Sequence, residues 1–166
     1  SRVPPPVATF LLTSTTRAME ILKHHQRTMT NTIQLVDDVP DDDYSIIKER
    51  APYIKLVQVV HVIDEISVDY ACRKSEYVDA LLLDSGNPNL PVKELGGTGR
   101  VHNWQLSRKI MEQVKVPVFL AGGLNSSNVK RAIEEVGPFG VDICSGVRSD
   151  GKLDSKKLEE FFKEIY

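Results

Sequence analysis

Val118-Phe-Leu-Ala-Gly-Gly-Leu-Asn125 joins a short apolar run to a paired glycine turn. Further along the chain, Gly140-Val-Asp-Ile-Cys-Ser-Gly-Val147 repeats this arrangement. Each apolar run has the length of a strand that helices cover on both faces, as in parallel α/β sheets. A helical pattern follows each turn, and a glycine turn that delivers backbone N–H groups toward the start of a helix is typical of an anion site.

Two such turns on consecutive strands match the phosphate site that β/α barrels build after strands 7 and 8. The alternative interpretation is that the glycines only supply a positive φ in two tight turns. One glycine pair by itself would favour that alternative. The two turns together, in the same context, predict a phosphate-binding site.

The same alternation of strand and helix runs through the whole chain. Strands are predicted at residues 7–12, 32–36, 54–62, 78–83, 116–121 and 140–144. Helical patterns lie at 15–25, 44–50, 65–73, 104–113, 128–136 and 155–165. This order indicates a parallel sheet with right-handed crossovers, and we expect one domain over residues 1–166. Because a closed barrel needs eight units, six units predict either an open doubly wound sheet or a barrel that lacks two units.

Composition excludes several classes of protein. The 166 residues are 41% hydrophobic, which is enough to build a buried core. Their net charge of −2 gives no electrostatic reason to expect nucleic acid or an anionic membrane as a partner. No apolar run is long enough to span a bilayer, and no signal peptide is recognisable. The two cysteines and four histidines have no metal-ligand spacing. We therefore expect a cytoplasmic protein without metal or cofactor.

Five aspartates lie between Asp37 and Asp43. Their carboxylates are able to cap the following helix, close to the positive end of its dipole. We expect a solvated acidic loop here in preference to a metal site.

Asp84 directly follows the apolar run Ala80–Leu83. A carboxylate at such a strand end is partly desolvated, which suits it to general acid–base chemistry; it is equally able to cap its own loop as an Asx turn. The loop that follows contains Gly96-Gly-Thr-Gly-Arg100. Between an acidic strand end and two phosphate turns, this loop predicts an active-site lid, although a flexible Ω-type loop has the same composition.

Asp84, the Gly96–Arg100 loop with Trp104, and the two glycine turns, in this order and spacing, resemble phosphoribosylanthranilate isomerase. That family of tryptophan biosynthesis is a (βα)8 barrel, and the resemblance extends more weakly to Thr32–Leu35. It implies an isomerase of the TIM-barrel type that catalyses the Amadori rearrangement of N-(5-phosphoribosyl)anthranilate to a 1-deoxyribulose 5-phosphate. It also implies that Asp84 is the general acid on the furanose ring oxygen.

The resemblance further implies a set of residues that bind the phosphosugar substrate. These are Gly97, Thr98, Gly122, Gly123, Asn125, Asp142, Cys144, Ser145 and Gly146. Asp142 matches a carboxylate near the anthranilate end of the substrate, and the others match the loop and the phosphate turns.

The resemblance aligns Val7–Leu12 with the third strand of the family barrel. The family's first two units, which carry the general-base cysteine and an arginine, then have no counterpart in these residues. Cys72 lies in the middle of a helical pattern and is interpreted as a buried structural thiol. Cys144 stands where the family usually has serine, which favours a phosphate-turn residue over a replacement base. We expect a truncated barrel whose open edges are covered, for instance by a homo-oligomer.

Three positions depart from the usual family residues. Val36 stands in place of histidine, Asn103 in place of aspartate and Arg148 in place of glutamate. These departures indicate a divergent branch. Three functions therefore stay open: a phosphoribosylanthranilate isomerase in truncated form, a non-catalytic phosphosugar-binding protein, and another phosphosugar isomerase or epimerase that uses Asp84 with a different base. The first interpretation predicts that this chain alone binds phosphate but turns over little or no substrate.

Overall fold

The computed structural model describes residues 3–4, 6–87, 89–93 and 99–166. Six strands form one sheet in the order β1-β2-β3-β4-β5-β6, and every neighbouring pair is parallel. The strands are β1 (Phe10–Thr13), β2 (Thr32–Leu35), β3 (Lys55–His61), β4 (Ala80–Asp84), β5 (Val118–Leu120) and β6 (Gly140–Val141). The helices are α1 (Ala18–Thr28), α2 (Asp41–Arg50), α3 (Glu65–Ser75), α4 (Trp104–Gln113), α5 (Val129–Val136) and α6 (Ser155–Lys163). The predicted parallel α/β architecture of six strand–helix units is confirmed.

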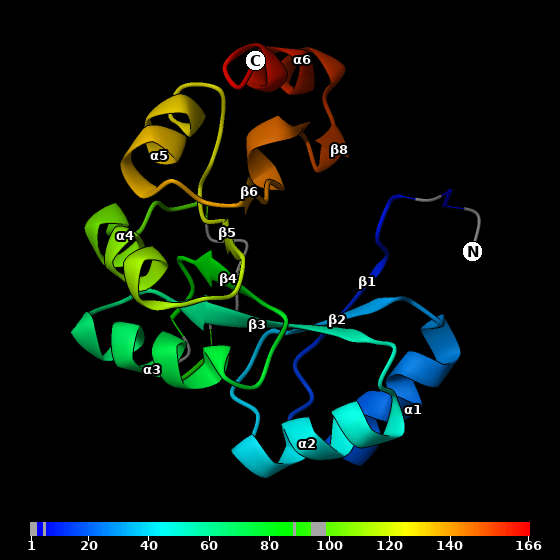
Figure 1. Ribbon diagram of the computed structural model, residues 1–166. Helices are drawn as coiled ribbons and strands as arrows, with labels where there is room; N and C mark the ends of the chain where they lie inside the picture. The colour runs from blue at the N-terminus through cyan, green and yellow to red at the C-terminus, as the bar shows by residue number, and fades with distance from the viewer. Residues whose placement is uncertain (1–2, 5, 88, 94–98) are drawn as a thin grey trace.

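The sheet is curved, and the helices lie along its outer side (Figure 1). At the two ends of the arc, β1 and β6 each pair with one strand only. Both edges are therefore open within the described part of the chain. The expectation that a second chain covers them stays a prediction. None of the helices in the described residues has the length and hydropathy needed to cross a membrane.

Two apolar clusters lie on the two faces of the sheet, as the alternation of side chains along each strand requires. Leu56 and Val60 of β3 face the helices and join the larger cluster. Val57 and Val59 face the inner side and join a smaller one with residues of β4 and β5. The apolar side chains in the middle of the sheet are buried, and polar residues follow at the carboxyl ends of the strands.

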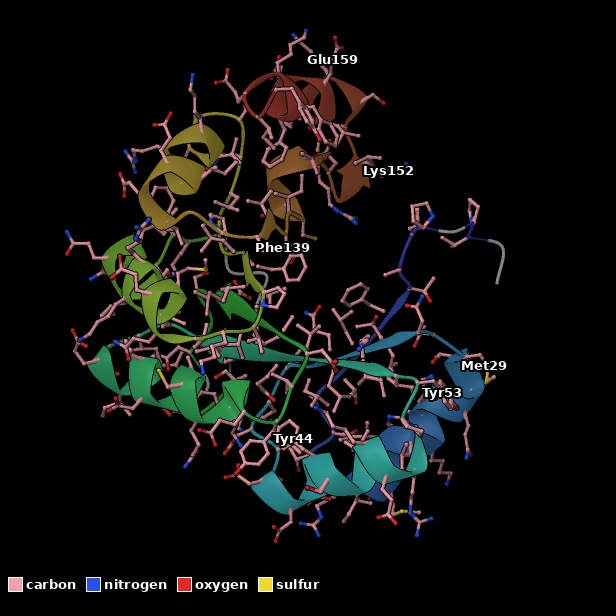
Figure 2. The ribbon with its side chains drawn as sticks, viewed as in Figure 1. Met29, Tyr44, Tyr53, Phe139, Lys152 and Glu159 are labelled. Carbon is pink, nitrogen blue, oxygen red and sulfur yellow. The ribbon has the colours of Figure 1, made fainter. Side chains whose placement is uncertain are left out.

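The inner face is less well covered toward the ends of the arc. Leu11 packs against the helix-side cluster, so its neighbours Phe10 and Leu12 face inward, where they are 42% and 60% exposed. Phe139, just before β6, is 71% exposed and meets the ring of Phe119 edge-on at 5.4 Å between centroids (Figure 2). These apolar side chains lack the neighbours that a continuous ring of strands would supply.

Several predicted boundaries differ from the structure. The first strand begins at Phe10 rather than residue 7, and the last strand ends at Val141 rather than residue 144. The second helix begins at Asp41 rather than residue 44, because Pro40 precedes its first turn and three aspartates in that turn interact favourably with the helix dipole.

A short antiparallel hairpin near the C-terminus was not predicted. A 3-10 turn (Ser145–Val147) leads into β7 (Arg148–Ser149) and β8 (Lys152–Leu153). Asp150 and Gly151 connect the two strands with φ of 50° and 75°. Asp-Gly is the preferred pair for such a two-residue turn, so this signal was present in the sequence. Arg148 donates to the Gly151 carbonyl oxygen at 3.0 Å, which gives this divergent residue a place in the hairpin.

The aspartate run surrounds a buried lysine, so the expectation of a simply solvated acidic loop is wrong. Lys74 is 1% exposed, and its ammonium group donates to the Val39 carbonyl oxygen at 2.6 Å and to Asp41 at 2.7 Å. Asp38 lies 3.0 Å from the same nitrogen, which also lies 5.0 Å from the centroid of the Tyr44 ring. These acids compensate a charge that burial would otherwise disfavour.

Candidate active site

Polar residues gather at the carboxyl ends of the parallel strands, where such folds place their ligands. His61 and Asp84 end β3 and β4 and are register partners. Beyond the ends of β5 and β6 follow the glycine turn at Gly122 and the carboxylate of Asp142. The strands thus bring together groups that are far apart in the sequence.

Asp84 is the last residue of β4 and is 9% exposed. Alternation along the strand places its side chain on the inner face, together with Leu82. Its Oδ1 accepts the Ser85 backbone N–H at 2.7 Å, and the hydrogen bonds among the described residues engage no other atom of this carboxyl group. Asp84 thus makes the local loop contact and keeps a second, desolvated oxygen on the inner face, and its role as a general acid stays a prediction.

The two glycine turns touch each other. Gly122 and Gly123 have φ of 86° and 64°, a region that other residues rarely adopt. A Cβ atom on Gly123 would lie 2.7 Å from the Arg100 carbonyl carbon, and one on Gly146 would overlap the Leu124 carbonyl oxygen. Glycine is therefore required at Gly146 for the second turn to pack against the first, and at Gly123 for the first turn to pack against the backbone of Gly99 and Arg100.

A small cavity of about 50 Å³ lies between the turns. Its walls come from Asp84, Gly99, Ala121, Gly122, Gly123, Leu124, Asp142, Ile143, Cys144 and Ser145. Within the described part of the chain, the backbone N–H groups of Gly122, Gly123, Ser145 and Gly146 take part in no hydrogen bond. Free backbone donors in adjacent turns suit an anion such as phosphate.

Asn125 braces the first turn with its side chain. Its Nδ2 donates to the Gly123 carbonyl oxygen at 3.2 Å, and its Oδ1 accepts the Ser127 backbone N–H at 2.9 Å. Asn128 donates to the same Gly123 oxygen at 3.0 Å. The amide of Asn125 is thus already engaged within the turn, whereas the resemblance implies a direct role in phosphate binding.

Asp142 shares the cavity with Asp84. Burial of the carboxyl group raises the pKa of Asp142 above its ordinary value, and the charge of Asp84 raises it further. Asp142 is nevertheless exposed at the mouth of the cavity, so solvent moderates this rise. Two carboxyl groups in different surroundings are able to divide the roles of proton donor and proton acceptor.

His102 is a neighbour of the site that sequence reasoning missed. Its ring packs beside Gly122, where an added Cβ atom would lie 3.1 Å from Nδ1. Nε2 lies 2.7 Å from the Ser107 hydroxyl, and the buried Nδ1 has no partner among the described residues. Burial lowers the pKa of His102 to about 4, against the opposing effect of the Asp84 charge. A lone histidine in a loop carries no motif, so the sequence contained no signal for this contact.

The remaining predicted residues lie around the site or away from it. Gly97 and Thr98 lie outside the described residues. Cys144 and Ser145 line the cavity and are exposed. Cys72 is half-buried on α3 and donates to Gln113 of α4 at 3.3 Å, which suits a structural thiol.

Two of the residues singled out in the sequence support the helix that follows the loop. Asn103 caps α4, since its Oδ1 accepts the Gln105 backbone N–H at 3.0 Å. Asparagine and aspartate cap helices about equally well, so this departure from the family preserves the local structure. Trp104 is 5% exposed, and the Arg131 guanidinium lies 4.9 Å from its ring centroid. The pair joins α4 to α5.

No three potential metal ligands gather in the described ranges.

Comparison with known proteins gives a consistent result. Residues 14–164 match the family model described as N-(5'phosphoribosyl)anthranilate (PRA) isomerase. A Methanosarcina acetivorans protein named N-(5'-phosphoribosyl)anthranilate isomerase is 35% identical over 92% of this chain and 66% of its own length. The chain thus spans about two thirds of that relative.

Solved structures of the same family have a similar fold. The crystal structure of phosphoribosyl anthranilate isomerase from Thermotoga maritima superposes with a TM-score of 0.79 and 30% identity, over 98% of this chain and 74% of that one. A crystal structure of a phosphoribosyl anthranilate isomerase in complex with reduced 1-(o-carboxyphenylamino)-1-deoxyribulose 5-phosphate gives a TM-score of 0.76 and 27% identity, over 98% of this chain and 73% of that one. The chain belongs to the N-(5'-phosphoribosyl)anthranilate isomerase family.

Proposed function

We propose that this chain carries the phosphate-binding and proton-donating part of an enzyme that isomerises N-(5'-phosphoribosyl)anthranilate to 1-(o-carboxyphenylamino)-1-deoxyribulose 5-phosphate in tryptophan biosynthesis. The observation that carries this proposal is the convergence of two interlocked glycine turns with Asp84 and Asp142 around one cavity. Family membership supports the same reaction.

The substrate phosphate binds to the backbone N–H groups of Gly122, Gly123, Ser145 and Gly146. Because these donors are held by the turns themselves, binding requires little rearrangement. The phosphate then fixes the sugar with its ring oxygen toward Asp84, which ends the adjacent strand.

Asp84 acts as general acid. It gives a proton to the furanose oxygen while the bond between that oxygen and C1 breaks, and the nitrogen lone pair forms the C1=N bond of an iminium ion. Removal of the C2 proton then leads to an enol, which becomes the ketone of the product. The resemblance assigns this second step to a cysteine on a strand that precedes the matched residues.

A second candidate function is phosphosugar binding without isomerisation. The two cysteines favour it: Cys72 is held on an outer helix, and Cys144 belongs to the phosphate turn. The decay of anthranilate fluorescence with freshly made substrate separates the two functions. When the preceding strands of a relative are supplied, isomerisation predicts a decay that Asp84→Asn slows and that Asp69→Asn, on the exposed face of α3, leaves unchanged. Phosphate binding without any decay, even after the preceding strands of a relative are supplied, would contradict the isomerase assignment.

A further inference from the structure

Gly122, the first residue of the paired glycine turn, packs against side chains from two other parts of the chain. A Cβ atom built on this glycine would lie 3.1 Å from Nδ1 of His102 and 3.0 Å from the hydroxyl oxygen of Ser85. Ser85 directly follows Asp84 at the end of β4, and His102 lies just before α4. The end of β4, the start of α4 and the first phosphate turn therefore meet at one glycine.

Helix α4 holds the other side of the His102 ring. Nε2 lies 2.7 Å from the hydroxyl oxygen of Ser107, which is fully buried in the first half of that helix. Asn103, the next residue along the chain, caps the same helix. The segment that carries His102 is thus fixed to α4 by two contacts, and neither Ser107 nor His102 lines the phosphate cavity.

The surroundings of the ring favour one tautomer. Nδ1 is buried and has no hydrogen-bond partner among the described residues. The direction of a built Cβ atom is that of one Cα hydrogen, so a C–H group of Gly122 faces Nδ1. A proton on Nδ1 would be a buried donor without an acceptor, whereas a lone pair there accepts a weak contact from the C–H group. These contacts favour a neutral ring whose Nε2–H donates to Ser107.

The position of this ring affects both parts of the proposed site. The Gly122 N–H is one of the donors that we assign to the phosphate, and its residue is held between His102 and Ser85. The Ser85 backbone N–H in turn donates to Oδ1 of Asp84 at 2.7 Å. A displacement of the imidazole would therefore move a phosphate donor relative to the carboxyl group of Asp84.

We propose that His102 is a positioning residue for the substrate phosphate, anchored to Ser107 through Nε2 and supporting the turn at Gly122 through Nδ1. It acts through the turn and makes no contact with the ligand. This assignment rests on the proposed function and deepens it, because it names residues outside the cavity that determine how tightly the phosphate is held.

A double-mutant cycle on the full chain tests the assignment, with inorganic phosphate as the ligand and isothermal titration calorimetry as the measurement. His102→Phe keeps a planar ring and removes both nitrogens, and Ser107→Ala removes the anchor of Nε2. Each should raise the dissociation constant by about three- to tenfold, the range for one hydrogen bond. The double variant should bind no more weakly than His102→Phe alone. His24→Phe, at an exposed histidine of α1, is the matched control and should bind normally.

The outcomes separate this assignment from the proposed function. Unchanged phosphate affinity in either single variant would overturn the role of His102 and leave the phosphate site intact. Additive losses in the double variant would also overturn it, because the two residues would then act independently. A wild-type chain that binds no phosphate would contradict the proposed function, on which the assignment rests.

The tautomer of His102 gives a test on the wild-type chain that depends neither on the folding of a variant nor on phosphate binding. In the imidazole ¹⁵N spectrum at neutral pH, Nδ1 should have the resonance of an unprotonated nitrogen and Nε2 that of a protonated one. A proton on Nδ1 would contradict the contact with Gly122 and overturn the assignment.

Discussion

Gly123→Ala is the substitution that the geometry of the phosphate site constrains most. At φ of 64° an alanine is disfavoured by about 1–2 kcal/mol. Its Cβ atom would also lie 2.7 and 2.8 Å from the carbonyl carbon and oxygen of Arg100 and 2.8 Å from the Gly99 oxygen. These are backbone atoms, so relief requires a shift of the loop, and overpacking of this kind adds about 1–3 kcal/mol. We expect a total destabilisation of about 2–5 kcal/mol.

Phosphate binding should fall along with stability. Moving the turn misplaces at least one N–H donor, and hydrogen bonds to charged groups contribute about 1.5–3 kcal/mol each. The dissociation constant for inorganic phosphate should therefore rise at least about tenfold. Urea denaturation measures the stability, and isothermal titration calorimetry measures the binding.

Gly151→Ala is the matched control. Gly151 has φ of 75° in the hairpin turn, and an added Cβ atom would meet nothing within 4 Å. This variant should lose about 1–2 kcal/mol of stability for the same conformational reason and bind phosphate normally. If Gly123→Ala bound phosphate as tightly as the wild type, or was no less stable than Gly151→Ala, the argument from contact between the first glycine turn and the backbone of Gly99 and Arg100 would be refuted.

Three further predictions concern other residues. In a complete enzyme, Asp84→Asn should reduce turnover by about 10²–10⁴-fold, measured by stopped-flow fluorescence, while calorimetry should still show substrate binding. Normal turnover of this variant would show that Asp84 is not the general acid. Lys74→Met should lower the free energy of unfolding by about 3 kcal/mol in urea titrations, because it leaves buried acceptors and Asp41 without their cation, and a neutral outcome would contradict that role. His102 has a pKa of about 4 in the folded state, below its value in the unfolded state. The unfolded chain therefore binds a proton at this histidine more readily than the folded chain does, so the free energy of unfolding should fall as pH drops from about 6.5 to 4. His102→Phe should flatten the pH dependence of urea midpoints over that range, and an unchanged slope would exclude this histidine as the cause.

Local patterns in the sequence predicted most of the architecture. Short apolar runs that alternate with helical patterns located the six strands, and Asp84 was found because it directly follows one of these runs. The Asp150-Gly151 hairpin was missed although Asp-Gly is a strong turn signal. Its flanking residues are polar and exposed, so hydrophobic alternation did not mark them as strands.

The rest of the site depends on contacts between distant segments. The approach of His102 to Gly122 follows from the path of a loop, and the pairing of His61 with Asp84 follows from strand register. Neither is encoded in a local pattern. Similarly, spacing alone could not show that Lys74 would be buried among the aspartates, because this depends on how α3 packs beside the loop after β2.

An NMR titration of the chain with reduced 1-(o-carboxyphenylamino)-1-deoxyribulose 5-phosphate tests the central claim most directly, because this ligand carries both the phosphate and the arylamine. The account predicts large amide shifts at Gly122, Gly123, Ser145 and Gly146, together with a change in the carboxyl resonance of Asp84. Binding without shifts in the two glycine turns, or shifts confined to the outer helices, would contradict it.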